Sequence, residues 1–514
     1  MRFTKVFAVL ITAMVLFVAQ IASAEEIVIF HTNDMHSRVL ETDDGNKSIG
    51  LAVLTSYIKN AKKSNPNTLW FDAGDTLHGM PRINISHGEN MVKLLNAAGV
   101  DAMVPGNHDF NYSAERLAEL AKKCNFPVMA SNVFWKKDGK RLLKSSKIFT
   151  LKNGVKIGVF ALATPETLYK ANPVYMSKVK FKDTVEVAKQ EITALKPKCD
   201  IIVAISHLGI DESSIIKSTD VAKAAPGIDV IIDGHSHTEL PTGITIGNTL
   251  IAQTGCYEHN LGKVTIDYEN KRIVSKKAEL LNKKAINKVV AGNGSDGADK
   301  LLPPDEKVTE TLNEIEKKNK TILDEKICEV SKSLSANREI IRRNEAEIGD
   351  LLTDSFVSAT GADAAIVNSG TIRADLKSGV VTRGDILSVF PFGNIVEVRK
   401  VSGKTLRQAL EHSVRYYPST AGGFLQVSGI TFDYDPNLPQ MQRVKNVTVK
   451  GAPLDDSAIY SIASLDFVFN GGDGYSMLKN LPLEKAYASI EEVFAEFIRN
   501  NPNLNFKSGR IKRL

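Results

Sequence analysis

The stretch Val230-Ile-Ile-Asp-Gly-His-Ser-His-Thr238 joins an apolar run of β-forming residues to two histidines at alternate positions. Alternate side chains of an extended chain point to the same face, so His235 and His237 can share a ligand. A single His-x-His is weak evidence for a site, because an extended chain produces this geometry whether or not a ligand binds there. The chain, however, repeats the arrangement of an apolar run followed by oxygen and imidazole donors.

Four other apolar runs end in the same kinds of residue. Residues 27–30 lead into His31-Thr-Asn-Asp-Met-His36, 68–71 into Asp72-Ala-Gly-Asp75, 102–104 into Gly106-Asn-His-Asp109, and 201–205 into Ser206-His207. Helical patterns at 50–63, 90–98, 114–124 and 184–195 alternate with these runs. Such alternation, from residue 27 to about 282, predicts an α/β layered fold, in which ligands bind beyond the carboxyl ends of the strands. The donors are therefore expected to form one shared site.

The amino-terminal residues have the pattern of a secretory signal peptide. Residues 1–5 include Arg2 and Lys5, residues 6–18 are apolar except for Thr12, and Ala22-Ser-Ala24 follows. A charged start, an apolar middle and a small-residue exit predict that residues 1–24 are cleaved off after Ala24. A retained membrane helix is the alternative, which the small-residue exit disfavours. We expect the mature chain to be periplasmic in a Gram-negative host or secreted otherwise, without a membrane anchor.

Composition limits the class of protein further. A chain of 514 residues is long enough for at least two domains. Its cysteines have no CxxC spacing, so a disulfide scaffold is not expected, although one or two bridges remain open; they are Cys124, Cys199, Cys256 and Cys328. The net charge of +6 is too small and too dispersed to favour a nucleic-acid polymer as partner. We expect a monomer or weak dimer that acts on a small molecule.

The sequence changes character between residues 282 and 300, where it becomes polar and rich in small residues. A domain boundary is expected there. We predict a first domain at residues 25–290, a linker at 291–324 that ends in a charged helix from Asp305, and a second α/β domain at 325–514. Within the second domain the pattern predicts helices at 345–360, 404–414 and 490–499 and strands at 364–368 and 395–401.

The donors at the strand ends suit a pair of divalent cations. Hydrolysis of a phosphate ester needs an anionic nucleophile and charge stabilisation at the phosphoryl oxygens, and two cations about 3.5–4 Å apart provide both. Mixed imidazole and carboxylate ligands favour Zn, Mn, Co or Fe over Mg or Ca. The candidate ligands are Asp34, His36, Asp75, Asn107, His207, His235 and His237. Asp75 is the predicted bridging ligand, because Gly74 lets the backbone approach closely. The other histidines, His31, His78, His87, His259 and His412, are predicted to be structural or exposed.

These blocks together resemble the successive motifs of the calcineurin-like metallophosphoesterases, and in particular those of the 5′-nucleotidase family, which includes periplasmic UDP-sugar hydrolases. The resemblance implies a four-layer metallophosphoesterase β-sandwich flanked by helices and joined by a linker helix to an α/β substrate-binding domain. It also implies a first metal site at Asp34, His36, Asp75 and His237, and a second at Asp75, Asn107, His207 and His235. His108 would be the catalytic imidazole that stabilises charge on the phosphoryl group.

One residue departs from the family pattern. Members that act as plain 5′-nucleotidases usually carry an Asp three positions after the catalytic histidine, where this chain has Asn111. An amide can orient an imidazole but cannot supply the negative charge that raises its pKa. Asn111 followed by Tyr112 is similar to the periplasmic 2′,3′-cyclic-nucleotide phosphodiesterase branch. His108 and Asn111 are thus the candidate catalytic residues.

The second domain offers candidates for nucleotide recognition. Guanidinium groups suit phosphate, and the faces of phenylalanine rings suit a base. The resemblance implies that Arg338, Arg342, Asn368 and Arg373 bind the phosphate and other polar groups of the substrate, that Phe392 and Phe467 sandwich the base, and that Asp473 binds the ribose hydroxyls. The Gly-Gly-Asp-Gly turn around Asp473 can aim its carboxylate.

The leading hypothesis is an exported two-metal phosphohydrolase that removes the 5′-phosphate from nucleoside monophosphates, with UDP-sugars and nucleoside di- and triphosphates as further candidate substrates. The rival within the enzymes is a 2′,3′-cyclic-nucleotide 2′-phosphodiesterase with 3′-nucleotidase activity. A binding protein with little turnover would require a broken catalytic set. A sulfate-ester hydrolase of the thiosulfohydrolase type would have no use for a base sandwich.

Overall fold

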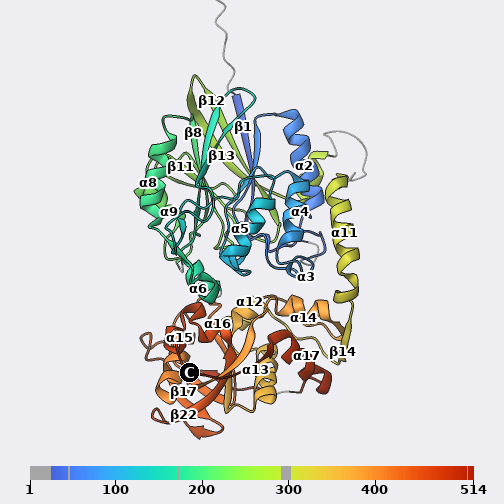
Figure 1. The fold of residues 1–514 in the computed structure, drawn as a ribbon, viewed down its shortest axis with the longest axis vertical. Helices are drawn as coiled ribbons and strands as arrows, with labels where there is room; N and C mark the ends of the chain where they lie inside the picture. Colours follow the sequence, from blue (N-terminus) through green and yellow to red (C-terminus); the bar gives the residue numbers. More distant parts are fainter. Residues whose placement is uncertain (1–24, 44–46, 172, 213, 291–301, 506) are drawn as a thin grey trace, which may run out of the picture.

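The computed structural model describes residues 25–43, 47–171, 173–212, 214–290, 302–505 and 507–514. The predicted signal peptide and the polar segment 291–301 lie outside the described residues. Figure 1 shows two lobes stacked along the long axis, with the amino-terminal half of the chain in one and the carboxyl-terminal part in the other. They are called here the first domain, from β1 to α10, and the second domain, from β14 to β24. The α/β fold class predicted from the sequence is confirmed, whereas the predicted domain boundaries stay predictions.

Two sheets form the centre of the first domain. One has the order β13-β12-β1-β2-β3 and the other the order β10-β11-β9-β8-β6-β5. The strands are β1 (Glu25–Thr32), β2 (Thr68–Asp72), β3 (Ala102–Met103), β5 (Ser146–Thr150), β6 (Lys156–Ala163), β8 (Ile201–His207), β9 (Val230–Ile232), β10 (Ile244–Ile246), β11 (Thr249–Ala252), β12 (Asn260–Glu269) and β13 (Arg272–Asn282). Strands β4 (Val133–Trp135) and β7 (Val179–Phe181) form a separate pair. Strands β1, β2 and β3 are parallel to one another, and so are β6, β8, β9 and β11.

Alternate side chains of strand β8 pack into two different hydrophobic cores. Val203 and Ile205 of β8 share one core cluster with Ile29 of β1, whereas Ile202 and Ala204 belong to a second cluster with residues of α8 and α9. This period of two places a β-sandwich between flanking helices. The helical segments of the first domain are α2 (Leu51–Ser64), α3 (Pro81–Asn84), α4 (Glu89–Ala98), η1 (His108–Phe110), α5 (Ala114–Lys123), α6 (Thr167–Lys170), α7 (Pro173–Met176), α8 (Thr184–Leu195), α9 (Ser218–Ala224) and α10 (Lys283–Val290).

The second domain has its own sheets and its own core. Its strands are β14 (Lys326–Val330), β15 (Ala364–Asn368), β16 (Gly379–Thr382), β17 (Ile395–Ser402), β18 (Leu425–Ser428), β19 (Ile430–Tyr434), β20 (Val444–Val449), β21 (Ala452–Pro453), β22 (Ile459–Leu465), β23 (Leu483–Ser489) and β24 (Ile511–Arg513). The larger sheets have the orders β18-β15-β22-β17-β23 and β21-β20-β19-β24. The helical segments are α12 (Arg338–Ile341), α13 (Glu347–Thr360), η2 (Ser369–Thr371), α14 (Arg383–Val389), α15 (Gly403–Val414), α16 (Asp466–Phe469), η3 (Gly472–Gly474), η4 (Ser476–Leu478) and α17 (Ile490–Asn500).

Helix α11 (Glu306–Leu323) runs along one side of the first domain and ends beside the second in Figure 1. Its N-cap is Asp305, whose carboxylate accepts the backbone N–H of Val308 and also pairs with Lys59 at 2.8 Å. An acidic cap satisfies one of the free N–H groups of the first turn and complements the helix dipole. Farther along the helix, Asn319 donates to the carbonyl oxygen of Arg82. A helix therefore forms where the sequence predicts the linker helix, and hydrogen bonds and an ion pair hold it against the first domain.

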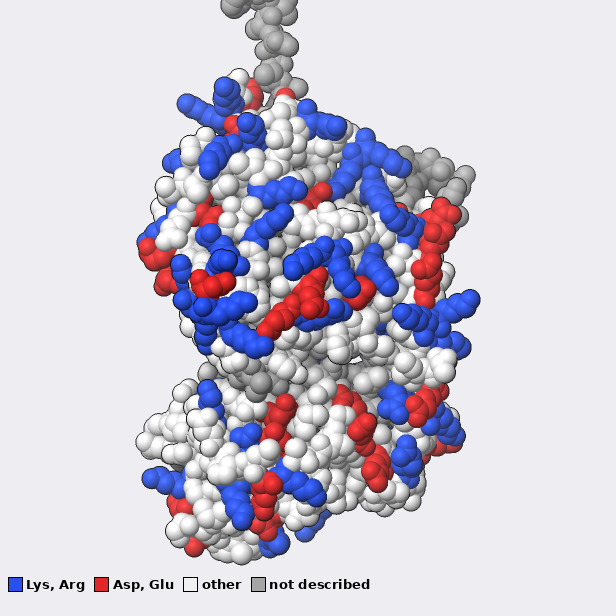
Figure 2. Space-filling model, in the orientation of Figure 1, with Lys and Arg blue, Asp and Glu red and all other residues white. Residues whose placement is uncertain are grey.

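Three further observations concern the surface charge, the cysteines and the apolar character of the helices. Figure 2 shows Lys and Arg as the more numerous charged residues on the visible face of the first domain, and charges of both signs on the second. All four cysteines lie in the described part of the chain, and none of them forms a disulfide bond there. Among the described helices, none has the length and apolar character needed to cross a membrane.

Candidate metal and nucleotide site

The predicted metal ligands follow the carboxyl ends of parallel strands. Asp34 and His36 come after β1, Asp75 after β2 and Asn107 after β3, in one sheet; His207 ends β8, and His235 and His237 follow β9, in the other. Because these strand ends lie at the same edge of the sandwich, the loops that follow them meet. The structure brings the candidates together in this way.

Two clusters of carboxylate and imidazole donors result. The ligand atoms of Asp34, His36 and His237 all lie within 4.8 Å of one another, as do those of Asp34, Asp75 and His207. Asp75 Oδ2 is 3.3 Å from His207 Nε2, and Asp34 Oδ1 is 3.4 Å from His237 Nε2. Acidic oxygens and imidazole nitrogens that converge in a buried place are the donors that a divalent transition-metal ion takes.

Two buried polar atoms at the donor clusters lack hydrogen-bond partners within the described part of the chain, and they show whether a metal ion would fit there. His207 Nδ1 donates to the carbonyl oxygen of Ala73 at 2.6 Å, so in the neutral ring Nε2 carries no proton and can bind a cation. This Nε2 atom and Asn107 Oδ1 are buried and make no hydrogen bond to any described residue. Buried polar atoms are nearly always satisfied, and an imidazole whose other nitrogen donates to a carbonyl is oriented as metal ligands are. The residues therefore fit divalent cations.

Two details of the predicted ligand sets remain predictions. Asp34, not Asp75, is common to both clusters, although Asp75 Oδ2 also lies 3.9 Å from His36 Nε2 and so reaches toward both sides. Asn107 and His235 belong to neither cluster. His235 Nε2 instead lies 2.8 Å from Glu166 Oε2, so Nδ1 is the nitrogen of His235 that is available to a metal. The rings of His207 and His235 have centroids 5.2 Å apart.

The backbone at these residues is strained. Left-handed φ angles, which are uncommon for residues other than glycine, occur at Asp34 (51°), His36 (46°), Asp75 (56°), His235 (78°) and His237 (54°). Such conformations cost free energy and persist only where the surrounding structure enforces them. Most of the predicted ligands are thus held in sterically unfavourable positions that aim their side chains at one place, as expected of a functional site.

The predicted catalytic pair is in contact. Asn111 Nδ2 lies 3.0 Å from His108 Nδ1, and an amide nitrogen only donates, so Nδ1 accepts and the single ring proton is on Nε2. The backbone N–H of His108 donates to Asp75 Oδ1 at 2.7 Å, which connects the predicted catalytic residue to the candidate metal ligands. Burial, together with Arg373 and the neighbouring imidazoles and opposed by Asp75, holds the pKa of His108 well below its usual range. The imidazole is therefore neutral at physiological pH.

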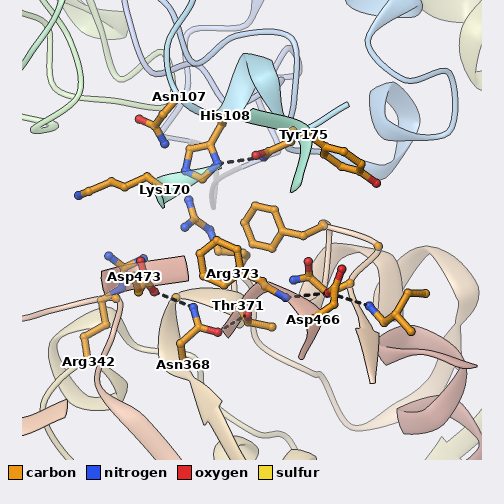
Figure 3. A pocket seen from close by; sticks show the side chains of 18 residues that line it. Asn107, His108, Lys170, Tyr175, Arg342, Asn368, Thr371, Arg373, Asp466 and Asp473 are labelled. Atoms are coloured by element: carbon orange, nitrogen blue, oxygen red, sulfur yellow. Dashed lines mark hydrogen bonds between the residues drawn. The ribbon is translucent and has the colours of Figure 1, made fainter. Parts of the chain in front are cut away.

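A cavity of about 290 Å³ lies between the two domains, next to His108. Figure 3 shows that side chains from both domains surround it. The first domain contributes Asn107, His108, Asn111, Lys170 and Tyr175, and the second contributes Arg342, Asn368, Arg373, Phe392, Phe467 and Asp473 among others. Of the predicted substrate-binding residues, Arg338 alone is not in the lining; it is exposed, and its Nη1 lies 3.4 Å from His237 Nδ1.

The polar lining carries excess positive charge. Within the described residues, Arg338, Arg342 and Arg373 form no ion pair with an acidic side chain. Burial, and after it the guanidinium groups of Arg338 and Arg373, lower the pKa of Arg342 to about 9. Beside Arg342, Asp473 Oδ2 accepts a hydrogen bond from Asn368 Nδ2 at 2.7 Å, and Asp473 has a left-handed φ of 50°. An anion such as a phosphate group would relieve the repulsion.

Comparison with known proteins agrees with this arrangement of two domains. Residues 27–239 match the sequence model of the calcineurin-like phosphoesterases, and residues 326–480 match that of the 5′-nucleotidase C-terminal domain. The chain belongs to the 5′-nucleotidase family. It is a metal-dependent phosphoric ester hydrolase with an amino-terminal metallophosphoesterase domain.

Similar proteins cover nearly the whole chain. The protein UshA of Salmonella pullorum is 27% identical over 93% of this chain and 92% of its own length. A 5′-nucleotidase of Vibrio cholerae is 28% identical over 92% of this chain and 90% of its own. The crystal structure of a 5′-nucleotidase precursor from Thermus thermophilus superposes with a TM-score of 0.81 at 29% identity, over 95% of this chain and 99% of that one.

Three supporting acids are not among the predicted site residues, although two of them stand in the strand-end motifs. The carboxylate of Asp109 accepts the backbone N–H groups of Asp75, Thr76, Leu77 and Gly106, at 2.7–3.0 Å. Asp72 accepts from the hydroxyls of Thr32 and Thr76. Glu166 holds His235 and follows the end of β6, another parallel strand. The position of Glu166 beyond a strand end was the signal that could have identified it.

Proposed function

We propose that the mature chain is an exported hydrolase that removes the 5′-phosphate from nucleoside monophosphates with the help of two divalent cations. The observation that carries this proposal is the single cavity that has His108 and Asn107 on one side and Phe392, Phe467 and Asp473 on the other. A nucleotide has a phosphate at one end and a base at the other, with a ribose between them. The phosphate would lie near His108 and Asn107, and the base and ribose near Phe392, Phe467 and Asp473. UDP-sugars and nucleoside di- and triphosphates are further candidate substrates. Export is inferred from the pattern of residues 1–24.

The cations, when bound, would supply an anionic nucleophile and neutralise charge on the phosphoryl oxygens. We propose Asp34, His36, Asp75 and His237 as ligands of one and Asp75, Asn107, His207 and His235 as ligands of the other. Glu166 would hold His235 in orientation, and the carbonyl of Ala73 would do the same for His207.

The protein side chains provide binding and charge stabilisation. Arg338, Arg342 and Arg373 would bind the anionic groups of the substrate, and the rings of Phe392 and Phe467 would hold the base. Asp473, already fixed by Asn368, would accept hydrogen bonds from the ribose hydroxyls. His108 Nε2–H would donate to a phosphoryl oxygen as negative charge develops on it.

A second candidate function is 2′,3′-cyclic-nucleotide phosphodiesterase with 3′-nucleotidase activity. The observation that favours it is the neutral His108–Asn111 pair. Phosphate or nucleotide release from 5′-AMP, 2′,3′-cyclic AMP, 3′-AMP and UDP-glucose separates the two, with chelator and metal add-back as the control. We expect 5′-AMP to be the best substrate and the chelator to abolish turnover reversibly. Efficient cleavage of cyclic AMP with negligible turnover of 5′-AMP would replace the first proposal by the second.

Replacing Asn111 with Asp is expected to raise turnover of 5′-monophosphates by about threefold to tenfold. A carboxylate 3.0 Å from His108 Nδ1 would raise the pKa of the imidazole, so that the cationic form persists to higher pH. The rate profile of this variant should show an alkaline limb, on which the rate falls back toward that of the wild type as the imidazole loses its added proton. Asn111→Ala, which removes the contact without adding charge, is the control and should not raise turnover. A lower rate in Asn111→Asp than in the wild type would contradict the reasoning.

A further inference from the structure

The loop that follows β2 reaches from the metal cluster to the second domain. It carries Asp75 and, three residues later, His78, which is 2% exposed. The next residue, Gly79, has a φ of 156°, and a Cβ atom there would lie 1.9 Å from the carbonyl oxygen of His36. Only glycine allows so close a contact. The loop is therefore pressed against His36, and the position of His78 is fixed relative to two candidate metal ligands.

The side chain of His78 crosses the domain boundary. Its Nε2 lies 3.1 Å from the carbonyl oxygen of Pro391, and Asn84 Nδ2 donates to the same oxygen at 3.0 Å. A carbonyl oxygen has two lone pairs and can accept both bonds. Burial, reinforced by Arg373, lowers the pKa of His78 to about 3, so the ring is neutral and its proton is on the nitrogen that donates. Tyr112 in turn fixes Asn84 by donating to its Oδ1 at 2.7 Å.

The residue after Pro391 is the aromatic ring expected to stack on the base. The ring of Phe392 is stacked on His78, with centroids 5.2 Å apart and an interplanar angle of 10°, and also lies 5.6 Å from the ring of His108 at 26°. Phe392 lines the nucleotide cavity and also a smaller cavity on the side of His78. It thus forms a wall between the two, in contact with the catalytic imidazole.

We propose that His78 and Asn84 are positioning residues that dock the segment Pro391–Phe392 of the second domain against the first, and so hold the base-stacking ring beside His108. This inference rests on the proposed function, because it assigns a consequence to base binding. A nucleotide would gain from the docking, since base and phosphate are then held at the right separation. A phosphate ester without a base would gain nothing from the docking. Among the histidines predicted to be structural, His78 thereby acquires a role in substrate selection.

Steady-state kinetics of the full mature chain with two substrates test the proposal. The first substrate is 5′-AMP or 2′,3′-cyclic AMP, whichever is cleaved faster, and the second is 4-nitrophenyl phosphate, which has no base. We expect His78→Phe combined with Asn84→Ala to lower kcat/KM for the nucleotide about tenfold or more, because both hydrogen bonds to the carbonyl oxygen of Pro391 are lost, and to change the value for 4-nitrophenyl phosphate less than about twofold. His78→Gln retains a donor and should restore part of the loss. His87→Gln is the matched control, because His87 is exposed and stacks on Tyr112 from outside the domain boundary.

A readout independent of turnover completes the test. Amide hydrogen exchange of residues 389–394 in the absence of substrate should be faster in His78→Phe/Asn84→Ala than in the wild type, and unchanged in His87→Gln. Combining His78→Phe with Phe392→Ala should cost no more on the nucleotide than Phe392→Ala alone. Equal losses on both substrates, additive losses, or unchanged exchange would each overturn the proposal. Failure of the wild type to cleave any nucleotide would overturn the proposed function instead, while the exchange experiment still tests the docking.

Discussion

Replacing Asp75 with Asn is expected to lower phosphate release from the best nucleotide by at least about a thousandfold. The amide has the shape of the carboxylate but lacks its charge. Asp75 Oδ2 lies 3.3 Å from His207 Nε2 and 3.9 Å from His36 Nε2, and Oδ1 accepts the backbone N–H of His108 at 2.7 Å. The substitution therefore weakens both candidate metal positions and disturbs the catalytic residue. The measurement is kcat together with the metal content of the purified variant by mass spectrometry.

A matched control is Asp101→Asn. Asp101 precedes β3, at the opposite end of the same sheet from the site, and its carboxylate accepts the backbone N–H of Trp70 and pairs with Lys62. This variant should keep its metal and most of its activity. If Asp75→Asn kept both bound metals and more than a tenth of the wild-type rate, Asp75 would not be a bridging ligand.

Replacing His108 with Gln is expected to lower kcat by about a hundredfold to ten-thousandfold without removing metal. His108 lines the cavity beside Asn107 and is not part of either metal cluster. Because the imidazole is neutral and has its proton on Nε2, we infer that it stabilises charge on the phosphoryl oxygens rather than protonating the leaving group. The loss should therefore be similar for a nucleotide and for 4-nitrophenyl phosphate, whose leaving group needs no proton.

The comparison of the two substrates decides the role of His108. A large loss on the nucleotide with a small loss on 4-nitrophenyl phosphate would identify the imidazole as a general acid. Metal content that falls together with activity would place His108 among the ligands. Retention of a third or more of the wild-type rate on both substrates would exclude it from the chemistry.

Much of the fold could be predicted because local patterns and tertiary structure agree. The helix predicted at 184–195 is α8, Thr184–Leu195, and the strand predicted at 364–368 is β15, Ala364–Asn368. The helix repeats its buried residues with the helical period, and the strand is a continuous apolar run, closed by Asn368, that is buried throughout. Helix α13 begins at Glu347 rather than at the predicted residue 345. Glu345 precedes the helix, and its carboxylate accepts the backbone N–H groups of Arg510 and Ile511, a distant contact that no local pattern predicts.

The meeting of donors at the site could also be predicted, because parallel strands bring their carboxyl ends to one edge. What the sequence did not give was the side-chain orientation. His235 Nε2 forms a hydrogen bond with Glu166, which is far from it in the chain, and no periodic pattern in the sequence predicts that contact. The same holds for His78, whose partners Pro391 and Phe392 belong to the other domain. Contacts of this kind depend on how two separately folded units are placed, and this placement leaves no local pattern in either segment.

The central claim is that Asp34, Asp75 and the surrounding imidazoles hold a pair of cations. An anomalous difference map from a crystal soaked in Mn²⁺, recorded near the manganese absorption edge, tests it most directly. We predict two peaks about 3.5–4 Å apart, flanked by Asp34, Asp75, His36, His207, His235 and His237. A map with no peak there, or with strong peaks only elsewhere, would contradict the account.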